Sequence, residues 1–448
     1  MNQFEVQAEF SVIGALLIDN DAIDRIPYLK SEYFYNNDNR LIFIELKKQI
    51  VAGSRADVIT VFDKLKDRIP ECLILLNSIA NSVGSSSNIL KYSEIIEDKA
   101  IKRALVMIGR EIEDVVATGQ NSAACVDLVA SKIDALIQRQ TIQEPNRLDD
   151  MLGDYVTLIE DRHSGKIKPI ATGYAALDEK LGGGIDRGTV TVVAGRPAMG
   201  KTAYGLGIAR NVSEWGTSLF LSMEMPKEQV CDRNISALGK IPLSWLRRPN
   251  TGNPLHDIYW NNLTVAFQKA QELNLYIDDQ TSLNVLAIRN KARKIKRIKE
   301  LDLLVIDQLS FITGSESDQL RLAIGEYTRG LLQIAKELQI AVVLLCQLNR
   351  ECEKRQDKRP IMSDLAESGS IEQDASTIIF LYRDEVYNPD SPDQGIAEII
   401  IKKQRQGLPG IVGMVYIGEQ TRFEDVTYGW KPTAPAQKTY KKGLANHL

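Results

Sequence analysis

The sequence has few of the residues that hold folds together through covalent bonds or metal ions. It contains five cysteines and three histidines among 448 residues, and no two cysteines are spaced as CxxC. An odd cysteine count without paired spacing argues against a disulfide framework and fits reduced thiols in a cytosol. Since there is also no HExxH motif, zinc chemistry is not expected.

Long hydrophobic runs are missing as well. No stretch of about 18 apolar residues occurs, which excludes a transmembrane helix. The N-terminus, MNQFEVQAEF, lacks the basic segment followed by an apolar segment that marks a secretory signal. We therefore expect a cytoplasmic protein without a membrane partner.

The composition is otherwise that of a globular protein, at a length too great for one hydrophobic core. Hydrophobic residues make up 44% and charged residues 25%. Because single cores stop growing at roughly 250–300 residues, we expect two or more domains. The net charge of −4 does not exclude nucleic acid, since binding depends on where the basic residues lie.

Residues 1–140 are predicted to form an all-helical domain. Apolar residues recur at helical spacing from Phe10 to Leu17 and again from Ile101 to Ile112. A further stripe from Val126 to Leu136 follows a polar turn, which predicts an antiparallel helical hairpin. Because nothing here has catalytic spacing, we interpret the region as a packing or oligomerisation domain.

Residues 141–169 are predicted to be a linker that contains one helix. Leu148, Met151, Tyr155 and Ile159 mark a single apolar face between polar flanks. A lone amphipathic helix must bury such a face, either on its own domain or on a neighbouring subunit.

In residues 170–428, short β-branched runs alternate with helical stretches, which predicts an α/β domain with a largely parallel sheet. Several runs are apolar on both faces, as buried parallel strands are. The candidate strands are 189–195, 218–223, 301–307, 341–346, 376–382 and 397–403. Residues 429–448 form a polar, basic tail that we expect to be unstructured.

One segment matches the phosphate-binding pattern GxxxxGK[ST] in full: Gly195, Arg196, Pro197, Ala198, Met199, Gly200, Lys201 and Thr202. A strand-like run leads into it and a helix-compatible stretch follows, as this motif requires. Glycines let backbone N–H groups turn inward around a phosphate. Lys201 would neutralise the β and γ oxygens, and the Thr202 hydroxyl would ligate Mg²⁺. The pattern therefore predicts an ATP site that works with Mg²⁺.

Two carboxylates are candidates to complete this site. Asp307 ends the apolar run 303–306, at the sheet edge where open α/β sheets bind ligands, and we expect it to hold the water shell of Mg²⁺. Glu224 follows the strand 218–223, which we expect to lie next to the phosphate-loop strand. A carboxylate there can orient and polarise an attacking water.

These residues, with Gln347 at the end of a later strand, resemble a RecA-type ATPase core. The stretches LFLSMEMP, LLVIDQLSFI, CQLNRECEKRQDKRPIMSDLAESGSIEQDA and IIIKKQRQG closely resemble the DnaB-type replicative DNA helicases. AEFSVIGALLIDNDAI resembles the N-terminal domain of the same family. The resemblance covers nearly all of residues 5–425.

The resemblance implies a homohexameric ring that encircles single-stranded DNA and moves 5′ to 3′ by hydrolysing ATP between subunits. It also implies a primase and a helicase loader as partners. Gln347 resembles the residue that senses the γ-phosphate and links hydrolysis to the DNA-facing loops. Lys403 and Arg405 occupy the positions of the basic pair that reaches the neighbouring subunit's γ-phosphate, where a guanidinium stabilises developing charge.

The segment 363–370 resembles the family loop that lines the central channel, and the expected DNA contacts in it are Ala366, Glu367, Ser368 and Gly369. Small residues and free backbone N–H groups suit sequence-independent phosphate contacts. The family usually has arginine where this chain has Ala366, which removes one positive charge, and Arg329 is a candidate to compensate. A basic run over residues 289–299 is interpreted as the solvated face of an outer helix.

Two other functions remain open from the residues alone. A recombinase that coats DNA as a RecA-like filament would share the ATP core but needs a different N-terminal domain. A non-catalytic ATP-binding scaffold or loader would bind nucleotide without turnover, and the intact Lys201, Glu224 and Arg405 speak against it.

Overall fold

The computed structural model describes residues 3–117, 125, 129, 132, 147–249, 252, 254–309, 312–313, 320–365, 368–426 and 430–431. The chain divides into two compact units, Met1–Arg147 and Leu148–Leu448. The second helix of the predicted hairpin and the C-terminal tail lie mostly outside the described residues. The finer division into four segments stays a prediction.

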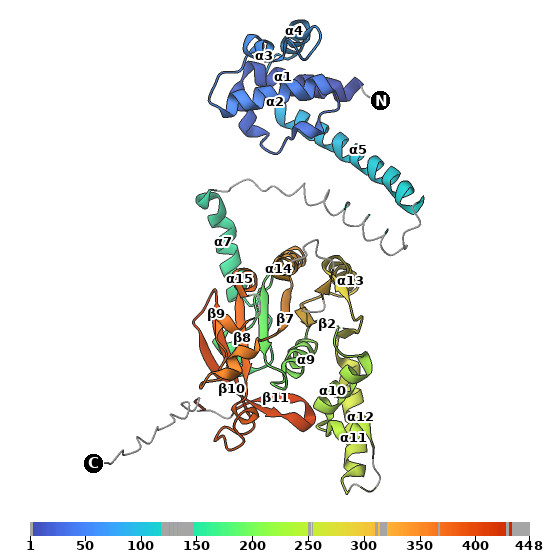
Figure 1. Ribbon diagram of the computed structural model, residues 1–448, viewed down its shortest axis with the longest axis vertical. Coiled ribbons are helices and arrows are strands. Elements are labelled where there is room, and N and C mark those ends of the chain that lie inside the picture. Colours follow the sequence, from blue (N-terminus) through green and yellow to red (C-terminus); the bar gives the residue numbers. More distant parts are fainter. Residues whose placement is uncertain are drawn as a thin grey trace, which may run out of the picture. The chain divides into compact units, whose positions relative to one another are not determined.

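The first unit is helical, as the apolar spacing predicts (Figure 1). Its α-helices are α1 (Gln3–Ile18), α2 (Asn37–Val51), α3 (Val58–Leu65), α4 (Cys72–Ser82) and α5 (Ile89–Ala117), with short 3₁₀ turns at Asn20–Arg25 and Ser31–Tyr33. Asn36 and Asp57 begin α2 and α3 by accepting hydrogen bonds from first-turn amides. Val12, Ile13 and Leu16 of α1 are fully buried in the core of this unit.

The second unit is built on a nine-stranded sheet in the order β11-β10-β9-β8-β1-β7-β5-β2-β3. The strands from β8 through β3 are parallel, and β9, β10 and β11 add antiparallel pairs at one edge. The strands are β1 (Val190–Gly195), β2 (Ser218–Ser222), β3 (Leu275–Asp278), β5 (Leu303–Asp307), β7 (Ala341–Gln347), β8 (Thr377–Tyr382), β9 (Ile396–Gln404), β10 (Gly410–Ile417) and β11 (Arg422–Asp425). A short parallel pair joins β4 (Leu283–Asn284) to β6 (Ile312–Thr313).

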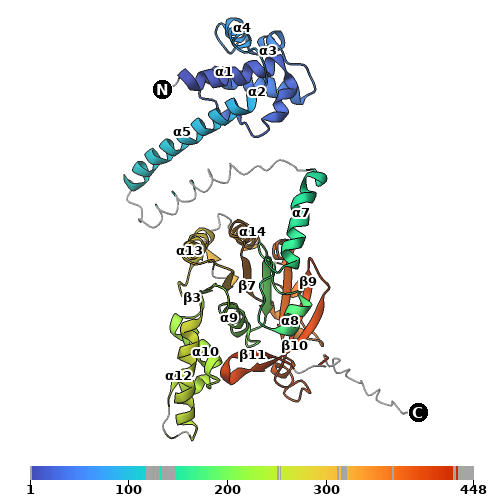
Figure 2. The ribbon, with the colours of Figure 1, turned by 180° about the vertical axis from the view of Figure 1, so that it is seen from behind.

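Helices cover both faces of this sheet (Figures 1 and 2). The helices of this unit, not all of which pack on the sheet, are α7 (Leu148–His163), α8 (Ala175–Lys180), α9 (Lys201–Val212), α10 (Lys227–Gly239), α11 (Leu243–Arg247), α12 (His256–Glu272), α13 (Val285–Ile298), α14 (Leu320–Leu338) and α15 (Ser368–Asp374), with 3₁₀ turns at Arg350–Lys354, Met362–Asp364, Asp384–Val386 and Gly418–Gln420. None of the helices in the described ranges is long and apolar enough to cross a membrane.

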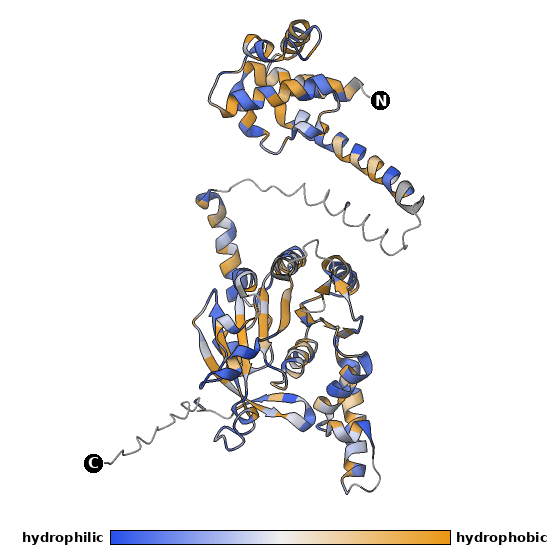
Figure 3. Cartoon of the chain, viewed as in Figure 1, coloured by the Kyte–Doolittle hydropathy of each residue, from blue (hydrophilic) through white to orange (hydrophobic). Residues whose placement is uncertain are grey.

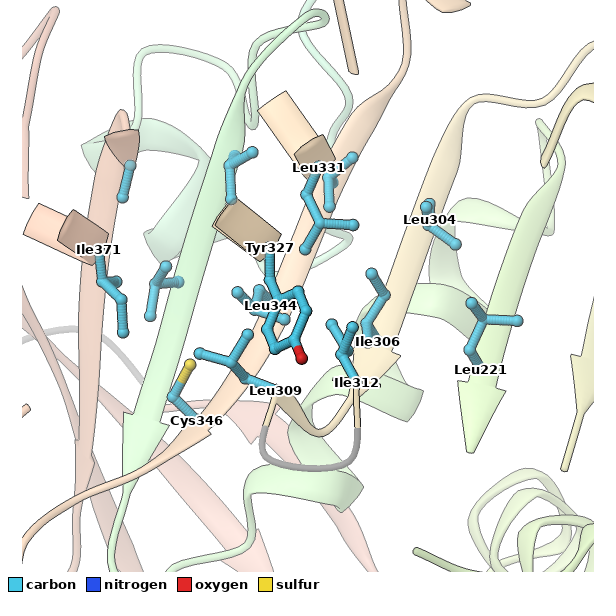
Figure 4. Packing of buried hydrophobic residues seen from close by; sticks show 14 of the residues in the cluster. Leu221, Leu304, Ile306, Leu309, Ile312, Tyr327, Leu331, Leu344, Cys346 and Ile371 are labelled. Carbon is cyan, nitrogen blue, oxygen red and sulfur yellow. The ribbon is translucent and has the colours of Figure 1, made fainter. Parts of the chain in front are cut away.

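Alternate residues of each central strand point into two separate cores, which explains why the runs are apolar on both faces. On one face, Tyr327 and Leu331 of α14 pack over Leu344 and Cys346 of β7 and Ile306 of β5 (Figure 4). The other face packs against α9. The predicted α/β architecture with a largely parallel sheet is confirmed.

The position of β2 is a correction to the sequence interpretation. We expected this strand to lie beside the phosphate-loop strand β1, but β1 pairs with β7 and β8, and β2 pairs with β5 and β3. Two strands therefore separate β1 from β2. The following strand in the chain is not the neighbouring strand in the sheet, because the crossover skips the central positions.

Helix α7 has the predicted amphipathic pattern but buries none of its side chains. Six apolar residues are strongly exposed: Leu148, Met151, Leu152, Tyr155, Val156 and Ile159. Orange and blue turns alternate along this helix in Figure 3. An apolar face of this length on one exposed helix marks a surface suited to association.

Candidate nucleotide-binding site

The predicted phosphate loop connects β1 to α9 at the carboxyl edge of the parallel strands. Ala198 and Gly200 have φ angles of 67° and 93°, in the left-handed region. A Cβ on Gly200 would lie 3.0 Å from the Phe423 ring, so glycine is required both for conformation and for space. Because α9 begins at Lys201, its first-turn amides face the loop as donors.

Four of the predicted residues form two hydrogen bonds at the floor of the loop. The Thr202 hydroxyl donates a 2.7 Å hydrogen bond to Oδ2 of Asp307, and Lys201 Nζ donates a 3.0 Å bond to the Gly195 carbonyl. Asp307 ends β5 and is 1% exposed. The sequence prediction that this carboxylate lies at the sheet edge beside the loop is confirmed in geometry.

Burial dominates the electrostatics of this floor. It raises the pKa of Asp307 to about 6, and the nearby charge of Glu224 acts in the same direction, while Thr202, Lys201 and Arg233 oppose it. Burial also lowers the pKa of Lys201, against the effect of the two carboxylates. Burial therefore disfavours the charged form of both groups, so a cation near Asp307 and an anion near Lys201 would each be stabilising.

A cavity of about 320 Å³ opens above this floor. Glu224 and Gln347 line it although their strands, β2 and β7, are not adjacent. The lining includes residues that the sequence interpretation missed: Met225, Arg233, Gln308 and Tyr416. Arg233 lies on α10 and Tyr416 on β10, so no local motif marks either as part of the site.

The Arg196 side chain is held by protein groups. Its Nη1 donates to the Leu348 carbonyl at 2.8 Å and its Nε to Glu353 at 2.7 Å. We predicted Arg196 as part of the phosphate cradle, and what it offers a phosphate is its main-chain amide, because its guanidinium is already occupied.

A second cation lies at the rim of the loop. Arg383 donates to the Ala198 carbonyl at 2.9 Å and lies 4.2 Å from the centre of the Tyr416 ring. An aromatic face with a guanidinium stacked beside it is a surface on which a planar base can lie.

Lys403 and Arg405 lie at the amino end of the parallel strands, whereas the phosphate loop of the same chain lies at their carboxyl end. Since β9 is antiparallel to β8, Lys403 pairs with Ile378 at the start of β8, whereas the phosphate loop follows Gly195, which pairs with Leu381. Along the strands this separates Lys403 from the level of Gly195 by roughly 10 Å, and Arg405, whose amide donates to the Ser376 carbonyl, by roughly 16 Å. Both cations donate to main-chain carbonyls of the segment 372–375 at the end of α15.

Of the predicted DNA-contact residues, Ala366 and Glu367 lie outside the described residues. Ser368 and Gly369 begin α15, and Arg329 is exposed on α14 beside it. The two helices approach at Gly325, where a Cβ would lie 2.9 Å from Ser370 Oγ and 3.3 Å from Arg329 Nη2. Arg329 thus lies next to the helix that carries the predicted loop.

The basic run lies on α13, as expected for an outer helix, and acidic neighbours neutralise part of it. Arg293 pairs with Glu337 at 2.7 Å and Lys291 pairs with Asp278. Arg289 is buried and lies 3.5 Å from the same Glu337. These pairs involve three of the seven basic residues between positions 289 and 299.

The floor of the site fits a magnesium ion bound together with nucleotide. Thr202 and Asp307 offer two oxygen ligands, and Oδ1 of Asp307 is buried without a hydrogen-bond partner among the described residues. Magnesium is typically held by one or two protein oxygens plus substrate phosphates. In the described part of the chain, no group of three His, Cys, Asp or Glu side chains offers a metal site independent of nucleotide.

Comparisons with known proteins cover both units. Residues 169–425 match the family model of the DnaB-like helicase C-terminal domain, and residues 1–98 match that of the N-terminal domain. The replicative DNA helicase DnaB of Haemophilus influenzae is 35% identical over 439 residues, which are 94% of this chain and 93% of the relative. The replicative DNA helicase DnaC of Bacillus subtilis is 36% identical over 431 residues, 93% of this chain and 94% of the relative.

Two solved structures have a similar fold. The structure of a DnaB-like replicative helicase and its interactions with primase matches with a TM-score of 0.75 at 29% identity, covering 94% of this chain and all of that chain. A solved ATPase domain of a second protein matches with a TM-score of 0.58 at 33% identity, covering 63% of this chain and all of that domain.

Proposed function

This chain belongs to the DnaB-like helicase family, and we propose that it works as a homohexameric ring that hydrolyses Mg-ATP between subunits to move 5′ to 3′ along single-stranded DNA and unwind the duplex ahead. Membership of this family makes it an ATP-dependent replicative DNA helicase.

One observation carries the assignment of the ATP site. A single cavity gathers the phosphate loop, Glu224 and Gln347, with the buried Thr202–Asp307 pair at its floor. These are the parts that phosphoryl transfer to water requires: a phosphate cradle, a metal site and a carboxylate facing the reacting centre.

The protein's own groups divide the chemistry. The loop amides and Lys201 bind and orient the phosphates, and Lys201 exchanges its bond to Gly195 for a phosphate oxygen. Glu224 accepts a hydrogen bond from the attacking water and holds it in line. Thr202 and Asp307 would hold a magnesium ion, which would neutralise charge on the phosphate oxygens. Gln347 contacts the γ-phosphate.

The remaining charge stabilisation comes from a second copy of the chain. Lys403 and Arg405 cannot reach their own phosphate loop, since the length of the strands lies between. We assign them to the neighbour's γ-phosphate, where the guanidinium stabilises the transition state. Arg383 and Tyr416 at the rim provide a stacking surface for the nucleotide base.

The assigned DNA contact is the loop 366–369, supported by Arg329 on the adjacent helix. Contacts made through backbone amides and one cation are independent of base sequence, as translocation along any strand requires. Primase and a helicase loader are proposed partners. A solved relative describes interactions with primase, and we place the corresponding contact of this chain on its helical N-terminal unit.

The test compares the wild-type protein with Glu224→Gln, which keeps the cradle and the metal ligands but weakens the base. We expect wild-type ATP hydrolysis to be stimulated by single-stranded DNA and forks with a 5′ tail to be unwound. Glu224→Gln should bind ATP normally and lose about 10²–10⁴-fold in kcat. An ATP hydrolysis rate that single-stranded DNA does not change, or unwinding that starts only from 3′ tails, would contradict the proposal.

A further inference from the structure

A second cavity, of about 660 Å³, lies at the amino ends of the parallel strands. Its lining comes mainly from the segments that lead into β2, β3, β5 and β7, whereas the phosphate loop lies at the carboxyl end of the same sheet. The two cavities share no residue, and the five residues of β2 span roughly 15 Å. The volume falls within the roughly 300–1,000 Å³ that is usual for small-molecule sites. The cavity is therefore a candidate binding site separate from the ATP site.

An exposed indole belongs to the lining of this cavity. Trp215 follows the last turn of α9, where its amide donates to the Val212 carbonyl at 3.3 Å, and the residue is 53% exposed. Trp245 and Trp260 pack against each other with ring centres 5.6 Å apart, whereas in the described part of the chain no aromatic ring packs on Trp215. A large apolar ring that stays open to solvent offers a face on which a planar ligand can stack.

Lysine side chains bring positive charge to the same cavity. Lys299 Nζ donates to Oδ1 of Asn274, and a neutral amide does not compensate the charge of the ammonium group. Lys296 lies 3.9 Å from Glu300, whose side chain is 84% exposed, so solvent weakens this ion pair. Lys166 adds a third ammonium group to the lining. These groups suit an anionic ligand.

The other carboxylate of the lining, Asp302, is neutralised inside the protein. Its Oδ2 accepts a 2.8 Å hydrogen bond from the Thr217 amide, its Oδ1 pairs with Arg187, and its side chain is 10% exposed. Arg187 also donates to the Gln339 carbonyl at 3.3 Å. These bonds tie together the segments before β1, β2, β5 and β7, so the cavity has a fixed wall and an excess of positive charge.

We propose that this cavity is a second nucleotide-binding site, in which a base stacks on Trp215 and the adjoining phosphate is held by Lys296 and Lys299. An aromatic face beside cationic side chains binds bases and phosphates without reading the base sequence. A free nucleotide and a nucleotide unit within a single strand both present this chemistry. The inference goes beyond the proposed function, because none of the residues assigned there lines this cavity.

The test uses the whole protein with its ATP cavity saturated by Mg²⁺ and a non-hydrolysable ATP analogue. Two photoreactive probes are applied at subsaturating concentration: 5-iodo-dUMP, and oligo(dT) that carries 5-iodouracil. Iodouracil crosslinks to an aromatic ring on which it stacks, and peptide mass spectrometry locates the crosslink. The affinity for oligo(dT) is measured by fluorescence anisotropy over a range of salt concentrations.

Two variants remove the proposed contacts, and each has a matched control. Trp215→Ala is compared with Trp260→Ala, which removes an indole of similar exposure, 46%, from α12. The double variant Lys296→Gln with Lys299→Gln is compared with Lys294→Gln with Arg297→Gln. The control pair removes the same charge from exposed residues of α13 that do not line the cavity.

We expect a crosslink to Trp215, and its yield should fall about tenfold in the Lys296 and Lys299 double variant but not in either control. A crosslink from the oligonucleotide alone identifies a strand as the ligand, one from 5-iodo-dUMP alone a free nucleotide, and one from both probes a site open to either. All variants should keep the wild-type KM for ATP.

A strand in this site also has a signature in affinity. Trp215→Ala should then weaken oligo(dT) binding about tenfold, since one stacked base is lost. The Lys296 and Lys299 double variant should lower the slope of log affinity against log salt concentration by about 1.4, because each phosphate contact with a single strand contributes about 0.7.

Three results would overturn the inference: no crosslink to Trp215 from either probe, a crosslink whose yield the Lys296 and Lys299 double variant leaves unchanged, or an equal loss in the Lys294 and Arg297 control. The proposed function fails on other grounds, such as ATP hydrolysis that DNA does not stimulate, and that failure would leave the crosslinking result standing.

Discussion

At the scale of single residues, Asp307 shows how a binding site costs stability. Its carboxylate lies at the end of a buried strand and receives one hydroxyl hydrogen bond, from Thr202. Burial holds its pKa at about 6, so at neutral pH the protein keeps a charge in surroundings that disfavour it. A bound cation removes that cost. The charge of Asp307 therefore strengthens cation binding and lowers the stability of the fold without a cation.

This gives a prediction for Asp307→Asn. The raised pKa stabilises the fold while the carboxyl is protonated, fully so below its ordinary pKa of 3.8, and this stabilisation is lost as the pH rises through about 6. Asparagine has no such dependence. Without nucleotide and metal, we expect Asp307→Asn to become more stable than the wild type above that pH, by up to about 3 kcal/mol. Urea unfolding across the range checks it, and a difference between the two proteins that stays constant with pH would contradict it.

Arg196 and Arg405 show which residue properties can be predicted from the sequence. The motif places Arg196 in the phosphate loop, but its side-chain partners, Leu348 and Glu353, lie more than 150 positions away and no local pattern points to them. Arg405 was assigned by resemblance, and its distance from its own loop follows only from the antiparallel direction of β9. A local motif can identify a site residue. The direction of its side chain depends on partners that are distant in the sequence and that only the fold brings close.

At the scale of elements, the six buried strands could be predicted because each is a short apolar run that needs no partner to be recognised. Their order could not be, since β1 pairs with residues 342–347 and 377–381 and apolar strands are interchangeable by composition. Five further strands, β3, β4, β6, β10 and β11, were missed. The sheet ends at β3 and β11, β10 lies beside β11, and partial exposure weakens the apolar pattern of all three. The pair β4 and β6 is only two residues long in each strand.

Helix α7 leads to a prediction on assembly. Its exposed apolar face has no buried contact in the chain, so covering it with a neighbouring copy would stabilise a ring. We expect Tyr155→Asp, on that face, to reduce the hexamer fraction in sedimentation velocity while leaving the fold intact. Thr157→Asp, on the opposite side of the helix, is the control and should assemble normally. Equal assembly of both variants would show that this face is not used.

At the scale of the whole molecule, the proposed active site needs two copies of the chain. One contributes the cavity with Lys201 and the other contributes Arg405 from the far edge of its sheet. Such head-to-tail interfaces use different surfaces on the two partners, so a defect in either surface damages a different half of the site.

Mixing two inactive variants tests this arrangement. We expect Lys201→Ala and Arg405→Ala each to lose about 10³-fold or more in hydrolysis when pure. In a reassembled equal mixture, roughly a quarter of the interfaces join an intact cavity to an intact arginine, and activity should return to that extent. Pure Arg405→Ala that hydrolyses ATP normally, or a mixture as inactive as its components, would rule out the shared site.

The opposed positions of the phosphate loop and the basic pair also bear on how many sites an assembly can operate. Each protomer carries one half of the proposed ATP site on each of its two interface surfaces, the phosphate loop on one and Arg405 on the other. An open assembly therefore always leaves one phosphate loop and one arginine without a partner at its two ends. Closing the ring brings these two together and adds one more complete site. Hydrolysis per subunit would then report whether the ring is shut, and a loader that holds it open would reveal itself as one missing site per assembly.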